Sequence, residues 1–123
     1  MTETSPIDLS TLVRLLQLQV RTGADRLDRP VRGGYVGDLL SDVMGNSHEG
    51  DLWITRQVHP NIVAVASLKD LAAIVLVNGS EPAPETLTKA EAEGIPVLLA
   101  EESAFAVAGK VYALITGAVQ IAT

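Results

Sequence analysis

An uninterrupted apolar run at residues 71–77 constrains the fold more than any other stretch of this chain. It contains only Leu, Ala, Ile and Val, and it is far shorter than the roughly 20 residues that a membrane-spanning helix requires. Strands buried on both faces are typical of parallel sheets, which helices cover on each side. We therefore interpret residues 71–77 as an inner strand of a parallel sheet.

Short strands alternate with helical segments through most of the sequence. The segment at 52–56 favours a strand, and Pro60 suits the first turn of a helix that follows a polar loop. We predict helices at residues 5–23, 38–44, 60–71, 84–93 and 103–117, and strands at 24–35, 52–56, 71–77 and 95–100. This alternation predicts one α/β domain over residues 1–123, with three layers and a mainly parallel sheet flanked by helices. Residues 1–23 would be the N-terminal helix, 24–117 the α/β core, and 118–123 a tail or an edge strand.

Capping residues indicate where several helices begin and end. Ser5 with Pro6 has the form of a helix start, and Gly23 can supply the left-handed stop. Asp38 and Ser103 can cap the helices that follow them. An apolar stripe on the last predicted helix comprises Phe105, Val107, Ala108, Val111, Tyr112 and Ile115. Such a stripe is expected to pack on the sheet.

Composition excludes several classes of function. The net charge is −6 and no Lys/Arg cluster is present, so binding to a phosphate backbone is disfavoured. Aromatic residues make up only 3% of the chain, which leaves little for base stacking. Cysteine is absent and residues 1–6 do not resemble a signal peptide. We expect a cytoplasmic protein that binds neither nucleic acid nor membrane.

Polar residues follow the predicted strands at one end of the sheet. The loops at 38–42, 55–61, 78–81 and 101–103 would gather there, where open α/β sheets bind ligands. Asp38, Asn61, Asn78 and Ser103, each taken singly, are better explained as helix caps or turn formers. His59 beside Arg56 and Asn61 is the most reaction-like cluster, since imidazole titrates near neutrality and guanidinium recognises carboxylate or phosphate.

No complete catalytic or metal-binding motif accompanies that cluster. The sequence contains no Gly-x-Ser-x-Gly elbow and no phosphate-gripping Gly-Lys-Ser/Thr loop. His48 and His59 do not have a recognised ligand spacing. Asp38 and Asp42, predicted on one helix face, could hold a hard cation or be a cap followed by a solvated carboxylate. We predict no catalytic residue, no metal and no cofactor.

Several motifs carry a resemblance to a known family. They are Gly34-Tyr35-Val36-Gly37-Asp38-Leu39-Leu40-Ser41-Asp42-Val43-Met44, Trp53-Ile54-Thr55 with His59, Asn61-Ile62-Val63-Ala64-Val65-Ala66, and Lys89-Ala90 before Gly94-Ile95-Pro96-Val97. The chain resembles a stand-alone DRTGG-domain protein over nearly its whole length. Such domains are similar to the N-terminal domain of HPr kinase/phosphorylase, and they are also fused within some phosphotransacetylases and CBS-containing pyrophosphatases. In place of the namesake residues the chain has Val58-His59 and Val77-Asn78-Gly79.

The resemblance implies a domain with the fold of the HPr kinase N-terminal domain that regulates or dimerises, without the kinase's phosphate-binding loop. We expect a non-catalytic regulatory or small-ligand-sensing domain that forms a homodimer, because apolar helix faces lie at both ends of a small chain. Two alternatives remain open. One is a small enzyme acting on a phosphorylated or acidic metabolite through His59, and the other is a purely structural subunit of a protein partner.

The candidate ligand-binding residues combine the family motifs with the predicted loop positions. They are Asp38, Ser41, Asp42, Thr55, Arg56, His59, Asn61 and Asn78. Arg56 and the helix start near Pro60 provide positive charge, so the expected ligand is a small anionic metabolite. The carboxylates of Asp38 and Asp42 would repel a bare phosphate, so the ligand should also carry donors or arrive with a cation.

Overall fold

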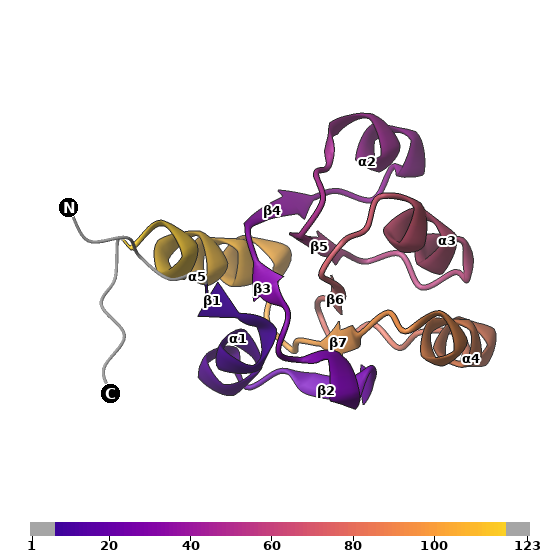
Figure 1. Cartoon of the computed structure of the whole chain (residues 1–123), viewed down its shortest axis with the longest axis horizontal. Coiled ribbons are helices and arrows are strands. Elements are labelled where there is room, and N and C mark those ends of the chain that lie inside the picture. Colours follow the sequence, from indigo (N-terminus) through magenta and orange to yellow (C-terminus); the bar gives the residue numbers. More distant parts are fainter. Residues whose placement is uncertain (1–6, 118–123) are drawn as a thin grey trace.

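A computed structural model describes residues 7–117 and confirms a mainly parallel sheet flanked by helices (Figure 1). In chain order the elements are β1 (Ile7–Asp8), α1 (Leu9–Leu16), β2 (Gln19–Thr22), the 3-10 helix η1 (Ala24–Arg26), β3 (Pro30–Val31), β4 (Gly33–Val36), α2 (Leu40–Asn46), β5 (Asp51–Thr55), α3 (Asn61–Leu68), β6 (Ala73–Leu76), α4 (Pro84–Glu93), β7 (Val97–Leu99) and α5 (Ala104–Thr116). The predicted tail or edge strand at 118–123 lies outside the described residues.

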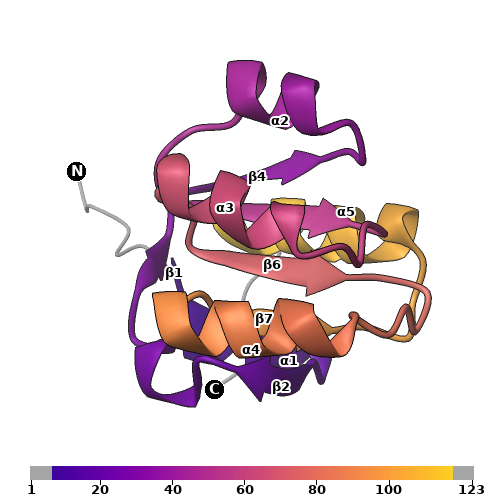
Figure 2. The same ribbon diagram turned by 90° about the vertical axis from the view of Figure 1, so that its right-hand side faces the viewer.

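The main sheet has five strands in the order β2-β7-β6-β5-β4. Strands β4, β5, β6 and β7 run parallel to one another, and β2 pairs antiparallel with β7 at one edge. Strands β1 and β3 form a separate antiparallel pair. Helices α1 and α5 cover one face of the main sheet, while α2, α3 and α4 cover the other (Figures 1 and 2). The inner strands are therefore buried on both sides.

Alternation along the strands sends neighbouring residues into two separate cores. Tyr35, Trp53, Ile74 and Val97 are aligned across the four parallel strands and belong to the core under α2, α3 and α4. The adjacent row contributes Ile54, Val75 and Leu98 to the core under α1 and α5. The continuous apolar run at 71–77 thus reflects a strand that feeds both cores.

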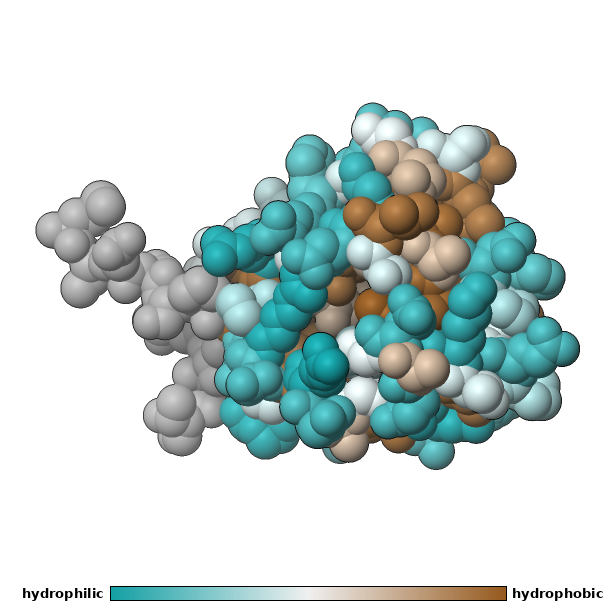
Figure 3. Space-filling model, turned by 45° about the vertical axis from the view of Figure 1, so that its right-hand side comes forward, coloured by the Kyte–Doolittle hydropathy of each residue, from teal (hydrophilic) through white to brown (hydrophobic). Residues whose placement is uncertain are grey.

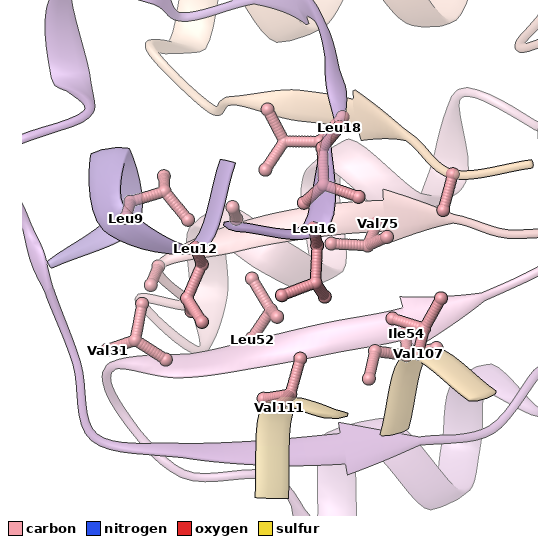
Figure 4. Close-up of a cluster of buried hydrophobic side chains, with 14 of the residues drawn as sticks. Leu9, Leu12, Leu16, Leu18, Val31, Leu52, Ile54, Val75, Val107 and Val111 are labelled. Carbon is pink, nitrogen blue, oxygen red and sulfur yellow. The ribbon is translucent and has the colours of Figure 1, made fainter. Parts of the chain in front are cut away.

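The core under α1 and α5 brings the first and last described helices together. Leu9, Leu12 and Leu16 of α1 point toward the sheet residues, as do Val107 and Val111 of α5 (Figure 4). Each fully buried aliphatic side chain of this kind stabilises the fold by about 1.5–3 kcal/mol. This cluster holds α1 and α5 side by side on one face of the sheet.

The prediction of a single helix up to Gly23 was wrong. Helix α1 begins at Leu9, where the Asp8 carboxylate accepts a hydrogen bond from the Thr11 N–H at 2.9 Å. It ends at Gln17, whose φ of 54° is left-handed, and the chain then returns as β2. Residues that continue the helical spacing in sequence, such as Val20, instead pair with β7. Non-local strand pairing has overridden the local pattern.

Two further boundaries differ from the sequence-based expectation. The strand expected over 24–35 is divided into η1, β3 and β4. Helix α2 begins after Leu39, which provides no side-chain cap, and it continues through Gly45 to Asn46. Asp38 does not cap this helix, because its carboxylate instead accepts hydrogen bonds from Thr55, the last residue of β5, and from Arg56.

Helices α4 and α5 agree with the predicted capping. Helix α4 begins at Pro84 and is followed by Gly94 with φ 71°. In α5 the Ser103 hydroxyl accepts a hydrogen bond from the Ala106 N–H at 3.2 Å, and Gly117 follows with φ 77°. Between residues 7 and 117, no helix has the length and apolar character required to cross a membrane.

Candidate functional site

Asp38 joins the loops that follow β4 and β5. The Thr55 hydroxyl and the Arg56 backbone N–H both donate to Asp38 Oδ1 at 2.8 Å. The Gln57 side-chain amide donates to the Asp38 backbone carbonyl at 2.9 Å. These bonds fix two loops at the carboxyl ends of neighbouring parallel strands, where ligands of open α/β sheets are found. We call Asp38, Thr55 and Arg56 the Asp38 cluster.

In the Asp38 cluster the negative charge is held by hydrogen bonds, whereas the positive charge faces solvent. The backbone N–H of Arg56 lowers the pKa of Asp38, with further lowering by the Thr55 hydroxyl and the Arg56 charge, against the opposing effect of partial burial. Asp38 is therefore ionised at neutral pH. The Arg56 residue is exposed, and no hydrogen bond or ion pair engages its guanidinium among residues 7–117. A cationic group is left facing solvent beside a fixed carboxylate.

The position of the β4 loop is set by the core beneath it. Trp53 is fully buried, and its indole N–H donates to the Gly37 carbonyl at 2.9 Å. The Gly37 N–H donates to the Ile54 carbonyl at 3.1 Å. Sequence reasoning did not assign Trp53 or Gln57 a role in the site. A single tryptophan in a buried strand was the available signal, because a buried indole N–H requires an acceptor.

Ser41 and Asp42 lie on α2 and do not join the Asp38 cluster. Asp42 accepts hydrogen bonds from the Tyr35 hydroxyl and from the Asn46 amide, the latter at 2.9 Å. Ser41 is exposed. The prediction that Asp38 and Asp42 share a helix face was wrong, because α2 begins at Leu40 and leaves Asp38 in the preceding loop.

His59 and Asn61 interact locally at the start of α3. The Asn61 backbone N–H donates to His59 Nδ1 at 3.1 Å, so the imidazole satisfies a free donor of the first helical turn. No described acidic side chain hydrogen-bonds to His59, whereas an acid bonded to the imidazole would favour an enzyme. The preceding Val58 carbonyl accepts from the Thr86 hydroxyl at 2.6 Å and the Ala83 N–H at 3.2 Å, which ties this loop to α4.

Asn78 occupies the turn after β6. Its φ of 57° is left-handed, and its N–H donates to the Glu102 carbonyl at 2.9 Å. The neighbouring Gly79 N–H donates to the Ala100 carbonyl at 2.9 Å. These bonds join the β6 and β7 loops to each other. Of the eight candidates in the described part of the chain, Asp38, Thr55 and Arg56 form one hydrogen-bonded group, and His59 and Asn61 form a separate pair.

The surface beside the Asp38 cluster is partly apolar. Leu39, which follows Asp38, is 68% exposed, and Met44 of α2 is 38% exposed. In the view of Figure 3 polar residues cover most of the surface, and apolar residues gather toward the top, where α2 and α3 lie. Within residues 7–117 no group of three His, Asp or Glu side chains is placed to hold a metal ion.

A comparison with protein families identifies the family of the chain. The family model for the DRTGG domain matches residues 11–114, which include every main-sheet strand and the Asp38 cluster. The chain belongs to the DRTGG domain family. The similarity of this DRTGG domain to the N-terminal domain of HPr kinase/phosphorylase stays a prediction. A comparison with curated proteins found no match.

A solved structure supports the fold. The CBS and DRTGG domains of the regulatory region of Clostridium perfringens pyrophosphatase, complexed with the activator diadenosine tetraphosphate, align with a TM-score of 0.68 and 17% sequence identity. The alignment covers 83% of this chain and 44% of that one. The DRTGG chain therefore spans less than half the length of the similar protein, and at this identity the likeness concerns the fold.

Proposed function

We propose that this DRTGG domain is a non-catalytic regulatory module that binds a small anionic ligand at the Asp38 cluster and forms a homodimer. The observation that carries the ligand site is the exposed Arg56 guanidinium, which has no hydrogen-bonding partner among residues 7–117, beside loops that Asp38 holds in place. A preorganised loop lowers the ordering cost of binding. The cluster therefore has the parts of a recognition site and lacks those of a catalytic one.

The chemistry of the cluster selects among anions. The Arg56 guanidinium can form two parallel hydrogen bonds to a phosphate or carboxylate. The ionised Asp38 carboxylate repels a bare phosphate and accepts hydrogen bonds from hydroxyl or amine groups. Leu39 offers an apolar surface next to both. A nucleotide combines an anionic group, hydroxyl donors and an apolar base, so it matches all three features.

The similar protein supports the same class of ligand. The regulatory region of the Clostridium perfringens pyrophosphatase was crystallised with diadenosine tetraphosphate, its activator. That ligand combines phosphates with adenosine groups. A nucleotide is accordingly the first class to test on this chain.

Calorimetry can test the ligand site with three probes, namely diadenosine tetraphosphate, ATP and inorganic phosphate. We expect a nucleotide to bind more tightly than inorganic phosphate, and Arg56→Ala to weaken that binding by about 1.5–3 kcal/mol, the value of a charge-assisted hydrogen bond. Arg14→Ala is the matched control, because Arg14 is an exposed arginine on α1. Absence of binding by all three probes, or equal losses in both variants, would contradict the proposed site.

The non-catalytic assignment has its own test. His59 Nδ1 accepts the Asn61 N–H, so this nitrogen is engaged in capping rather than poised as a base. We expect no hydrolysis of ATP or diadenosine tetraphosphate with Mg²⁺ present. Turnover that disappears in a His59→Ala variant would establish the enzyme alternative instead.

A further inference from the structure

A groove of about 610 Å³ runs between α5 and β4, at the edge of the main sheet. Arg32 is the one charged residue among the twelve that line it, so the groove carries a single positive charge and no negative one, on a chain whose net charge is −6. In Figure 1 α5 lies beside β4, on the side of the sheet away from α2, α3 and α4. The groove is therefore separate from the Asp38 cluster and from the apolar surface around α2.

Two glycines create the hollow. Gly34 of β4 and Gly109 of α5 both line the groove. A Cβ added at Gly34 would meet its nearest atom, the Leu52 carbonyl oxygen, at 3.7 Å, and one added at Gly109 would meet nothing within 4 Å. Packing among the described residues does not require glycine at either position. A glycine inside a helix also lowers helix stability. Gly109 therefore keeps the groove open while it makes α5 less stable.

Exposed aromatic residues flank this hollow. Phe105 is 91% exposed and Tyr112 is 70% exposed, although both belong to the apolar stripe of α5. Together with Ala108 and Ile115 they recur at intervals of three and four residues, the spacing with which paired helices interlock. Aromatic anchors of this kind concentrate binding energy in protein interfaces. The exposed face of α5 is thus patterned for contact with another helix.

The adjoining edge of β4 is open as well. No described strand pairs with β4 on the side away from β5. Because the Gly37 N–H bonds to β5, alternation along the strand turns the backbone groups of Gly34 and Val36 away from β5. Neither residue carries a charge that would protect the edge. The edge can therefore accept another strand.

We propose that a second copy of this chain docks on this face. Strand β4 pairs antiparallel with its copy, and α5 packs against the copy of α5, so that the same patch serves both protomers as two-fold symmetry requires. Two chains of charge −6 repel at most surfaces, whereas this face, whose groove carries no negative charge, lets them approach. Interface cores are depleted of charged residues in the same way.

Two aromatic residues supply about half of the buried area that a stable dimer needs. An aromatic side chain contributes about 150–250 Å² when it becomes buried, so the largely exposed Phe105 and Tyr112 supply roughly 300 Å² per protomer. The rest of the α5 face and the β4 edge need to add a comparable area to reach the total of about 1,200 Å² that specific interfaces bury. The inference rests on the homodimer of the proposed function and supplies its surface.

Sedimentation velocity of the full chain tests the surface with a matched pair of charged substitutions. Tyr112→Glu places a charge in the interface, while Leu68→Glu places one at another exposed apolar residue, which is 75% exposed at the end of α3. We expect a dimer for the unmodified chain and for Leu68→Glu. Tyr112→Glu should raise the dimer dissociation constant by about 100-fold, as loss of an interface anchor does.

A second pair of variants controls for misfolding of Tyr112→Glu. Gly109→Leu fills the groove from within the chain, whereas Gly45→Leu adds the same side chain to α2, where a Cβ also meets nothing within 4 Å. We expect Gly109→Leu to be a folded monomer whose Tm no longer depends on protein concentration, and Gly45→Leu to remain dimeric. If both Tyr112→Glu and Gly109→Leu remain dimeric, the chain dimerises through a surface other than α5 and β4. An unmodified chain that is monomeric would overturn the dimer together with its surface, without affecting ligand binding at Arg56.

Discussion

The two edges of the sheet end in different ways. At the β2 edge the register shifts between Val20 and Thr22, so Arg21 sits at an irregularity, and Arg21 forms an ion pair with Glu81 at 2.5 Å. At the opposite edge β4 presents Gly33–Val36, with no charge and no irregularity in its pairing with β5. Bulges and charges discourage strand pairing at sheet edges. The β2 edge is therefore protected, and the β4 edge is available.

Each edge is also attached to the core by one buried side chain. The Thr22 hydroxyl donates to the Ile95 carbonyl at 2.8 Å and accepts from the Val97 N–H at 2.9 Å. The Trp53 indole donates to the Gly37 carbonyl at 2.9 Å. The contrast between the edges thus lies in what each presents to solvent rather than in how it is anchored. Changes to the anchors should affect stability, and changes to the outer surface should affect association.

The largest effect is expected for Trp53→Ala, which empties a fully buried position and releases the end of β4. Phe/Trp→Ala changes in cores cost about 3–5 kcal/mol, so the free energy of unfolding measured in urea should fall by that amount. Trp53→Phe keeps most of the volume and should lose much less. Equal losses for the two variants would mean that the hydrogen bond to Gly37, rather than packing, holds this edge.

A smaller loss is expected at the other edge for Thr22→Val. Valine preserves the shape but leaves the Ile95 carbonyl and the Val97 N–H without their partner. Each unpaired buried group costs about 1–3 kcal/mol, which should appear as a reduced free energy of unfolding with no change in oligomeric mass. A change in mass would show that the β2 edge also takes part in association.

Edge chemistry itself can be compared with two lysine substitutions. Val36→Lys places a charge on the open β4 edge, and Gln19→Lys places one on the protected β2 edge, where the residue is already exposed. We expect Val36→Lys to weaken the dimer at least about tenfold, equivalent to 1.4 kcal/mol. Gln19→Lys should leave the dissociation constant unchanged. Light scattering over a dilution series would measure both, and equal effects would remove the distinction between the edges.

The smallest effect concerns Asp38, which ties the end of β4 to β5. Its pKa is lowered in the folded chain by the Arg56 N–H, the Thr55 hydroxyl and the Arg56 charge, so its ionised form stabilises the fold above the unfolded carboxyl pKa of about 3.9. That contribution is lost as pH falls through the lower folded value. Asp38→Asn should reduce the free energy of unfolding by about 0.5–1.5 kcal/mol at neutral pH, and the difference from the unmodified chain should shrink in acid.

Exposed Asp25 provides the control for that measurement, since no hydrogen bond to its side chain is present in the described part of the chain. Asp25→Asn should leave the stability at neutral pH nearly unchanged. A difference between Asp38→Asn and the unmodified chain that stays constant from neutral pH to pH 3 would show that the charge of Asp38 does not contribute.

Several elements could be predicted from sequence because neighbouring residues determine them. The apolar run at 71–77 identified the buried strand β6, and Pro84, Gly94, Ser103 and Gly117 marked the ends of α4 and α5. Capping hydrogen bonds and left-handed stops act within one helical turn. The residues responsible therefore lie next to each other in the sequence.

The candidate site was only partly predictable. The loops after β4 and β5 were expected to meet, and Asp38, Thr55 and Arg56 do meet there. Nothing local, however, distinguishes an Asp that caps the next helix from one that accepts hydrogen bonds 17 residues away. The choice depends on the parallel pairing of β4 with β5, which brings Thr55 within reach of the loop after β4.

The sequence by itself determined the class of fold, the buried strands and the ends of the later helices. The tertiary structure decided that residues 19–22 join the sheet instead of continuing α1, and that Phe105 and Tyr112 remain exposed while Val107 and Val111 of the same stripe are buried. Hydrophobic periodicity shows which residues of α5 are apolar. How many of them the main sheet can cover depends on how close α5 lies to the β4 edge. That placement follows from the packing of α1 and α5 on one face, and it leaves the outer side of α5 uncovered beside β4.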